Sequence, residues 1–192
     1  MNSKKIEIEI PAGKKAEWVN GVLTLVDEQV KDNRPVTERI KMFEDACKEL
    51  GESHELVNQY NSVLRGLADS NTTEEQDADI VAYLKLRIIA AALNEGWEPQ
   101  FTTDEWRYFP YFVLYTQEEI DEMDDEQKHR VVYRSYNSAN ALGGVASAGT
   151  VNVSSITFTY IGSRLAFKTR ELAKYAGEQF IEIWADYVFK AQ

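Results

Sequence analysis

Residues 80–93 constrain the fold of this chain more than any other segment. They combine good helix formers with apolar side chains on nearly every side of the helix that they predict. A helix that is apolar all round is stable only when other elements cover it. Asn94-Glu95-Gly96 then provides residues that favour a helix end. The sequence therefore predicts a helix over 80–93 that is buried against other elements of a folded domain.

The N-terminal region is predicted to form a small antiparallel sheet. Residues 6–10 alternate strictly between Ile and Glu, which is the period of a half-buried strand. Asn20-Gly21 favours the positive φ angles of a two-residue turn, and apolar residues flank it on both sides. A hairpin is therefore expected over 16–26.

Two amphipathic helices are expected between this hairpin and the buried helix. Pro35 suits a first helical turn, and residues 40–50 carry apolar side chains at helical spacing until a glycine ends the run. Ser53 is expected to cap a second helix over 53–67. Residues 69–79 are polar, and they predict either a solvated loop or the frayed start of the buried helix.

The chain changes character after Gly96 and predicts β structure. Residues 111–115 indicate a core strand, with a sheet edge near Pro110 because proline cannot donate a ladder hydrogen bond. Thr116 and Glu119 stand at the spacing of a capping box and predict a short acidic helix on the surface.

An acidic cluster over 121–126 follows. Asp124 or Asp125 suits the cap of a further turn. The cluster has the charge to attract a divalent cation, but it lacks the alternating oxygen ligands and the turn glycine of a calcium loop. A solvated helix face is the preferred interpretation.

These elements together predict an α+β fold. We expect an N-terminal β-hairpin or sheet, a central segment of about three helices, and a C-terminal antiparallel β region. A helix beginning at Thr169 is expected to pack back on the sheet and close the fold. A single domain over 1–192 is expected, and any subdivision would separate the hairpin and helices of 1–96 from the aromatic-rich region of 97–192.

Residues 131–163 differ from the rest of the chain in composition. Small polar residues are interleaved with Tyr, few charges occur, and residues 154–160 alternate like a strand. Such a mixture is typical of binding loops, where aromatic rings supply contact area and Ser, Asn and Gly supply adaptable hydrogen bonds. A turn-rich β-meander without a ligand is an equally good interpretation.

The formal net charge of −11 opposes nonspecific binding to nucleic acid or to anionic membranes. Neutralising phosphates requires clustered Lys and Arg, and only Arg164, Lys168 and Arg170 suggest a local basic patch. The N-terminus shows no apolar signal-peptide core, so synthesis in the cytoplasm is expected.

The sequence predicts no catalytic residue, no metal site and no cofactor. The single Cys47 fits the apolar face of a helix better than a nucleophile, and His54 and His129 lack spaced metal partners. Carboxylates in the aromatic segment offer the ingredients of a sugar-hydrolysing groove, although sequence spacing does not give their separation. These carboxylates are Glu98, Asp104 and Glu105.

Several strings of this sequence resemble an uncharacterised protein family of gut Bacteroidetes and their phages or prophages. The resemblance is carried by residues 14–21, 82–97, 162–168 and 179–186. It covers most of the chain and brings no known activity, so it implies a mobile-element setting rather than a reaction.

A narrower resemblance concerns residues 130–168. They are similar to the last part of C-type-lectin-like variable domains in phage receptor-binding proteins, where such a strand closes the fold and variable residues line a binding face. Those domains typically end near this strand, whereas this chain continues through a further helix. The resemblance implies the following contact residues: Tyr133, Ser135, Tyr136, Asn137, Asn140 and Asn152.

The expected function is therefore a noncatalytic binding or structural module of a phage or mobile genetic element. It would recognise a protein or a glycan through the 133–160 surface. A self-associating virion or assembly component is one alternative, and it would add virion association to the expected location. An acidic intracellular inhibitor or decoy of a host defence protein is another, and an enzyme acting on sugars is the last. No nucleic acid or membrane partner is expected, and the oligomeric state stays open.

Overall fold

The computed structural model of the chain describes residues 9–19, 21–27, 32–70, 77–100, 102, 104–135, 142–154 and 163–188. The chain divides after Arg34 into two compact units, residues 1–34 and residues 35–192. We call them the hairpin unit and the body. This division differs from the one expected at residue 96, because helices on both sides of that residue share one core.

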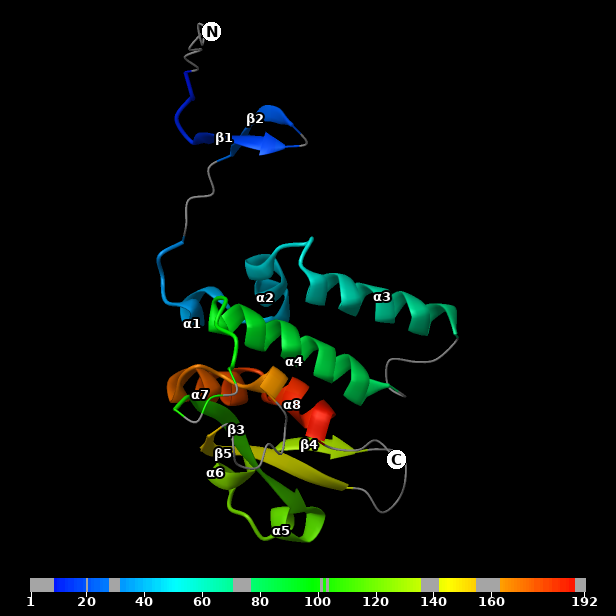
Figure 1. Cartoon of the computed structure of the whole chain (residues 1–192). Coiled ribbons are helices and arrows are strands. Elements are labelled where there is room, and N and C mark those ends of the chain that lie inside the picture. Colours follow the sequence, from blue (N-terminus) through cyan, green and yellow to red (C-terminus); the bar gives the residue numbers. More distant parts are fainter. Residues whose placement is uncertain are drawn as a thin grey trace, which may run out of the picture. The chain divides into compact units, whose positions relative to one another are not determined.

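The hairpin unit contains an antiparallel pair of strands, β1 (Lys14–Val19) and β2 (Val22–Asp27), as the sequence predicts (Figure 1). Gly21 has the positive φ of 79° that the predicted turn requires. Asn20 and most of the strand expected over 6–10 lie outside the described residues, and Glu9 and Ile10 are not part of a strand. The local turn signal therefore predicts this unit correctly.

The helix expected from Pro35 to residue 50 is two helices, α1 (Val36–Arg39) and α2 (Phe43–Leu50). Ile40 leaves helical geometry with φ −111° and ψ 97°, and its side chain is fully buried in the core. Asp45 Oδ2 then accepts the backbone N–H groups of Lys41 and Met42 at 3.0 and 3.1 Å. The prediction of one helix is wrong because this carboxylate starts a second helix.

The next two helices are α3 (Glu55–Asp69) and α4 (Ala78–Asn94). His54 caps α3 with its Nδ1, which accepts the backbone N–H of Leu56 at 3.2 Å. The expected cap at Ser53 is wrong because the helix begins one residue later than that cap requires. The buried helix is confirmed as α4, which ends where Glu95 and Gly96 adopt positive φ angles of 50° and 84°.

A three-stranded antiparallel sheet in the order β3-β5-β4 follows, formed by β3 (Trp106–Thr116), β4 (Val132–Ser135) and β5 (Leu142–Ser154). The N–H and C=O of Tyr108 bond Phe167 at 3.1 and 2.9 Å, on the side of β3 away from β5. Pro110 is two residues after Tyr108, so its backbone nitrogen points to the same outer edge of β3. Proline has no N–H to donate, and at this edge no strand of the described residues needs one. The edge expected near Pro110 agrees with this geometry.

The residues 142–154 form the central strand of the sheet rather than a loop. A Cβ on Gly144 would overlap Val131 Cγ1, which explains a small residue at this point of the strand. The register with β3 shifts between Tyr111 and Phe112, where β5 contains the extra residue. The Gly/Ala/Ser composition therefore reflects close packing on a central strand as much as flexibility.

Short helix α5 (Gln117–Asp121) has the predicted capping box of Thr116 and Glu119, and Asp124, one of the two expected caps, begins α6 (Asp125–Lys128) with a capping box to Gln127. The C-terminal helix expected from Thr169 is two helices, α7 (Arg170–Gln179) and α8 (Ile181–Val188), after the 3₁₀ turn η1 (Ser163–Leu165). The helix breaks at Phe180, where Trp184 Nε1 donates to the carbonyl of Ala176 at 3.2 Å and satisfies the end of α7.

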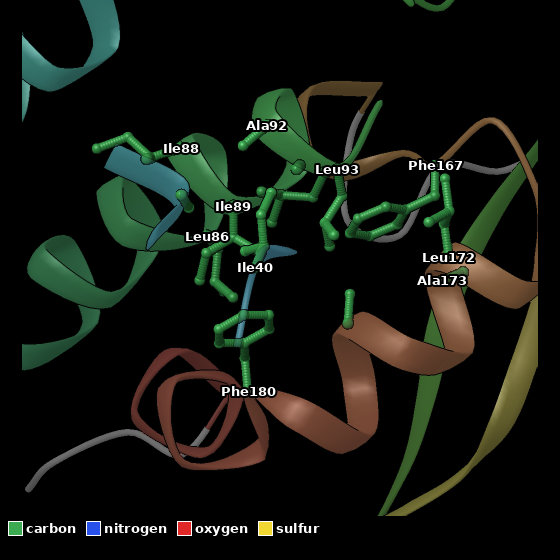
Figure 2. Packing of buried hydrophobic residues seen from close by; sticks show 14 of the residues in the cluster. Ile40, Leu86, Ile88, Ile89, Ala92, Leu93, Phe167, Leu172, Ala173 and Phe180 are labelled. Carbon is green, nitrogen blue, oxygen red and sulfur yellow. The ribbon is translucent and has the colours of Figure 1, made fainter. Parts of the chain in front are cut away.

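The core of the body surrounds α4. This helix packs against α2 and α3 on one side and against α7 and α8 on the other, while α7 also covers β3 and β5 (Figure 1). Figure 2 shows Ile89 and Leu93 of α4 among Ile40, Phe167 and Phe180, which come from three other segments. The apolar surround of α4 is thus covered on several faces, as its sequence requires.

Candidate functional site

The structure describes part of the predicted 133–160 surface. Tyr133 and Ser135 lie on β4 opposite Gly144 and Leu142, whereas Asn152 lies on β5 opposite Tyr108 of β3. Positions 144 and 152 are about 27 Å apart along an extended strand at about 3.4 Å per residue. The sheet therefore does not bring Asn152 next to the β4 positions. Three of the other predicted contact residues, Tyr136, Asn137 and Asn140, lie outside the described residues.

The hairpin unit presents an apolar face. Directly paired residues of an antiparallel sheet point to the same side, and successive pairs alternate between sides. Ala16 pairs with Leu25 and Trp18 pairs with Leu23, so these four residues share one side, which we call the apolar face. Trp18 is 74% exposed, Leu25 43% and Leu23 38%. Side chains that would form a core in a larger sheet are therefore in contact with solvent here.

The opposite side of the hairpin is mixed, because Val22 and Val26 lie on it with Lys15, Glu17 and Thr24, and Val22 is 65% exposed. Lys15 Nζ lies 2.6 Å from Glu17 Oε1, and Glu17 pairs across the strands with Thr24. The hairpin unit contains six basic and six acidic side chains, so the whole formal charge of −11 belongs to the body. The hairpin is thus a formally neutral unit attached to an acidic one, and its tryptophan and two leucines lie on one side.

Exposed apolar residues of the body are arranged differently. Trp106 and Leu114 lie on one side of β3, and they are about 27 Å apart along the strand. Tyr111 is also exposed, but its side chain points to the other side of the sheet. Side chains alternate along a strand, and Tyr111 is an odd number of residues away from Trp106 and from Leu114. These three residues do not form a continuous patch, in contrast to the apolar face of the hairpin unit.

A groove of about 260 Å³ lies in the body. It is formed by the start of α3, the second half of α4, residues 97–99, and the segment from η1 to Ala166. The start of α3, the stretch from α4 to residue 99, and the segment from η1 to Ala166 are separate in sequence, and the fold brings them together. The groove combines small and apolar residues with Arg87, Glu98 and Arg164.

Asn94 joins two walls of this groove. Its Nδ2 donates to the carbonyl of Ala166 at 2.8 Å, and its Oδ1 accepts the N–H of Lys168 at 3.0 Å. Lys168 Nζ in turn lies 3.1 Å from the Asn94 carbonyl and 3.2 Å from Glu95 Oε2. Because Asn94 is buried and its amide is bonded on both ends, this junction holds the two segments in fixed positions.

The histidines and the cysteine have contacts that stabilise the fold. His54 caps α3, and His129 Nδ1 lies 2.6 Å from the carbonyl oxygen of Asp125. Burial first, and the Glu44 carboxylate second, raise the pKa of the Cys47 thiol, which opposes a reactive thiolate. Within the described residues, no group of His, Cys, Asp and Glu has the arrangement of a metal site.

The aromatic segment does not bring its carboxylates to one point. Glu98 lines the groove, whereas Glu105 Oε2 accepts the backbone N–H of Gln100 at 2.6 Å. Asp104 is exposed and does not line the groove. Of these three carboxylates, Glu98 alone lines the groove.

Composition pointed to residues 131–163, but the most distinct surface of the described residues is the apolar face. Part of the signal for it is present in the sequence, since Ala16 and Trp18 are separated by polar Glu17 before the predicted turn. Residues 22–26 after the turn are apolar except for Thr24, so the sequence alone does not single out the side of Leu23 and Leu25. Searches of protein-family models, curated proteins and solved structures find no match to this chain. Among the described residues, no helix has the length and apolar character needed to cross a bilayer.

Proposed function

We propose that this chain is a noncatalytic binding module that recognises a protein partner, and that the hairpin unit makes the contact. The observation that carries the proposal is the exposed apolar face, on which Trp18 is the largest and most exposed side chain. Trp is among the residues that most often dominate the binding energy of protein interfaces. A formally neutral hairpin also avoids the charge repulsion that the acidic body presents to acidic partners.

The size of the apolar face favours a different protein over a second copy of the chain. Strands of six residues are about 20 Å long. Two such faces stacked on each other would bury less than the roughly 1,200–2,000 Å² of a stable interface. A partner whose surface surrounds the hairpin would cover both the apolar face and its edges. A two-stranded hairpin is also marginal alone, so the partner would stabilise its fold.

The setting in a phage or mobile element is supported by the resemblance of residues 14–21 and 82–97 to the prophage-associated family. The first of these strings includes β1 and its Trp18. The 133–160 surface remains a second proposed contact, for a protein or a glycan, with Tyr133 and Ser135 on the outer strand β4. The two surfaces belong to different units, so variants of one leave the other intact.

Affinity capture from a cell lysate with the full chain as bait tests the proposal. Trp18→Ala is compared with Trp106→Ala, which removes an exposed Trp (56%) from the body instead. The captured protein is identified by mass spectrometry, purified, and titrated against each variant. We expect Trp18→Ala to weaken binding about 30-fold, which corresponds to roughly 2 kcal/mol, and Trp106→Ala to change it less than about twofold.

Glu17→Gln, on the side of the hairpin opposite the apolar face, serves as a second control and should leave the affinity unchanged. Equal weakening by Trp18→Ala and Trp106→Ala, or by neither, would contradict a contact through the apolar face. In the second case Tyr133→Ala becomes the variant that tests the 133–160 surface.

Light scattering behind size-exclusion chromatography at two salt concentrations separates the alternatives. A salt-resistant oligomer would favour the virion or assembly component, because apolar contacts are not screened. Capture of a basic partner that is lost at high salt, and that Trp18→Ala does not affect, would favour the acidic inhibitor. A monomer with Trp18-dependent capture supports the proposed binding module.

A further inference from the structure

The groove beside Asn94 has an apolar interior. Leu56 comes from α3, Ala90 and Ala91 from α4, and Trp97 and Pro99 from the segment that follows α4. The alanines leave a hollow that longer side chains would fill, and Trp97 supplies a flat aromatic surface. A pocket lined in this way accepts a flat apolar group.

Two arginines line the same groove. Arg87 Nη1 donates to Gln59 Oε1 at 3.0 Å, and its Cζ lies 5.9 Å from the ring centroid of Tyr83. Arg164 is exposed. Neither arginine forms an ion pair within the part of the chain that the structure describes. In a body with a net charge of −11, two arginines without a carboxylate partner are available for an anion.

The groove is also held in place before any ligand arrives. The hydrogen bonds of Asn94 to Ala166 and Lys168 fix the wall that carries Arg164 against the end of α4, and Arg87 lies two turns earlier in the same helix. Gln59 and Tyr83 both contact the Arg87 guanidinium. A preformed site loses less conformational entropy on binding than a mobile one does.

We propose that this groove binds a small aromatic monocarboxylate. The ring lies against Trp97 and the alanines, and the carboxylate accepts hydrogen bonds from Arg164 and Arg87. The volume of about 260 Å³ is below the range of drug-sized pockets, which limits the ligand to one or two fused rings. Glu98 lines the groove as well, so it repels a second negative charge and disfavours dianions.

This site is separate from the apolar face of the hairpin unit, and it does not depend on the proposed protein contact. It is tested by titrating the full chain, labelled with ¹⁵N, with indole-3-carboxylate and with the neutral indole-3-carboxamide. We expect saturable shifts at the Trp97 indole N–H and at the amides of Ser163 and Ala166. The carboxamide should bind at least about fivefold more weakly, because it lacks the charge that the arginines recognise.

Matched substitutions assign the effect to the groove. Arg164→Gln and Arg87→Gln should each weaken indole-3-carboxylate by about threefold or more, and Arg170→Gln, at an exposed arginine outside the groove, by less than about twofold. Glu98→Gln should tighten binding by about twofold, because it removes a repelling charge. These surface substitutions leave the core intact, so the fold is preserved in each variant.

Equal affinity for the acid and the amide would overturn the proposal, since recognition would then be apolar only. So would shifts confined to the hairpin unit, or the absence of saturable shifts up to about 10 mM, a concentration at which even weak ligands of this size bind. Loss of affinity in Arg170→Gln equal to that in Arg164→Gln would show a general charge effect and would also contradict the assigned site.

Discussion

The hairpin unit and the body use tryptophan in opposite ways. Trp184 of the body is fully buried, contacts the ring of Phe112 with centroids 5.3 Å apart, and donates its indole N–H to Ala176. Trp18 of the hairpin unit is 74% exposed. One residue type thus completes an internal core in one unit and provides a surface for an external contact in the other.

The difference follows from the amount of chain in each unit. Two strands of six residues have one apolar side and no second layer to cover it. In the body, α4 lies between other helices, and α7 lies between α4 and the sheet. The body is therefore stabilised by its own core, whereas the hairpin unit gains most from a surface supplied by a partner.

Replacing the two tryptophans should give the largest contrast. Trp184→Ala is expected to destabilise the body by about 3–5 kcal/mol, because it leaves a cavity and removes the hydrogen bond to Ala176. Trp18→Ala should change the free energy of unfolding of the body by less than about 0.5 kcal/mol. Urea denaturation followed by far-UV circular dichroism measures both values. Similar losses in both variants would show that the two units unfold together.

Two glycines of the body should respond to alanine with opposite signs. A Cβ at residue 177 would lie 2.9 Å from Pro110 Cβ, so Gly177→Ala forces α7 away from β3 and should destabilise by about 1–3 kcal/mol. Gly66 of α3 has no atom within 4 Å of such a Cβ, so Gly66→Ala should stabilise by about 0.5–1 kcal/mol. Thermal melts of the two variants measure the difference. A stabilising Gly177→Ala would contradict the close packing of α7 on β3.

The smallest effect on the body is expected from Gly21→Ala. The φ of 79° at this turn disfavours alanine by about 1–2 kcal/mol, which is enough to open an isolated hairpin. Cross-strand nuclear Overhauser effects between Trp18 and Leu23 should disappear, while the Tm of the body changes by less than about 1 °C. A clear fall in that Tm would show that the body needs a folded hairpin.

Local signals in the sequence predicted many elements correctly. The Asn20-Gly21 turn, the capping box of Thr116 with Glu119 and the end of α4 each depend on residues within one or two turns of the chain. Asn94 and Glu95 at the end of α4 also bond Lys168, whereas the φ of Gly21 and the Thr116–Glu119 hydrogen bonds need no distant partner. For this reason the sequence predicts their positions.

Other elements depended on distant contacts, and their exact form was not predicted. Phe180 interrupts the C-terminal helical pattern because its side chain enters the core, while the indole of Trp184 satisfies the end of α7. Ile40 interrupts the first helix and is also buried in that core. Residues 142–154 form a central strand because β3 and β4 pair on both of its sides. Apolar periodicity alone does not show at which apolar residue a helix ends.

The two candidate sites also differ in how far the sequence predicts them. The predicted turn implies which residues share the apolar face. A two-residue turn fixes which residues of the two strands pair, and paired residues lie on the same side of the hairpin. The groove could not be predicted from the sequence. Its two arginines are 77 positions apart in the chain, and the Asn94 hydrogen bond to Ala166 holds their two segments together.

The sequence by itself determined the hairpin, the buried helix α4 and the capped short helices, because turns, caps and apolar periodicity act between near neighbours. The tertiary structure decided where the longer helices break, that 142–154 is a central strand, and that Arg87 and Arg164 share a groove. Those outcomes depend on packing between segments far apart in the chain, and the free energy of that packing is not a property of any one segment.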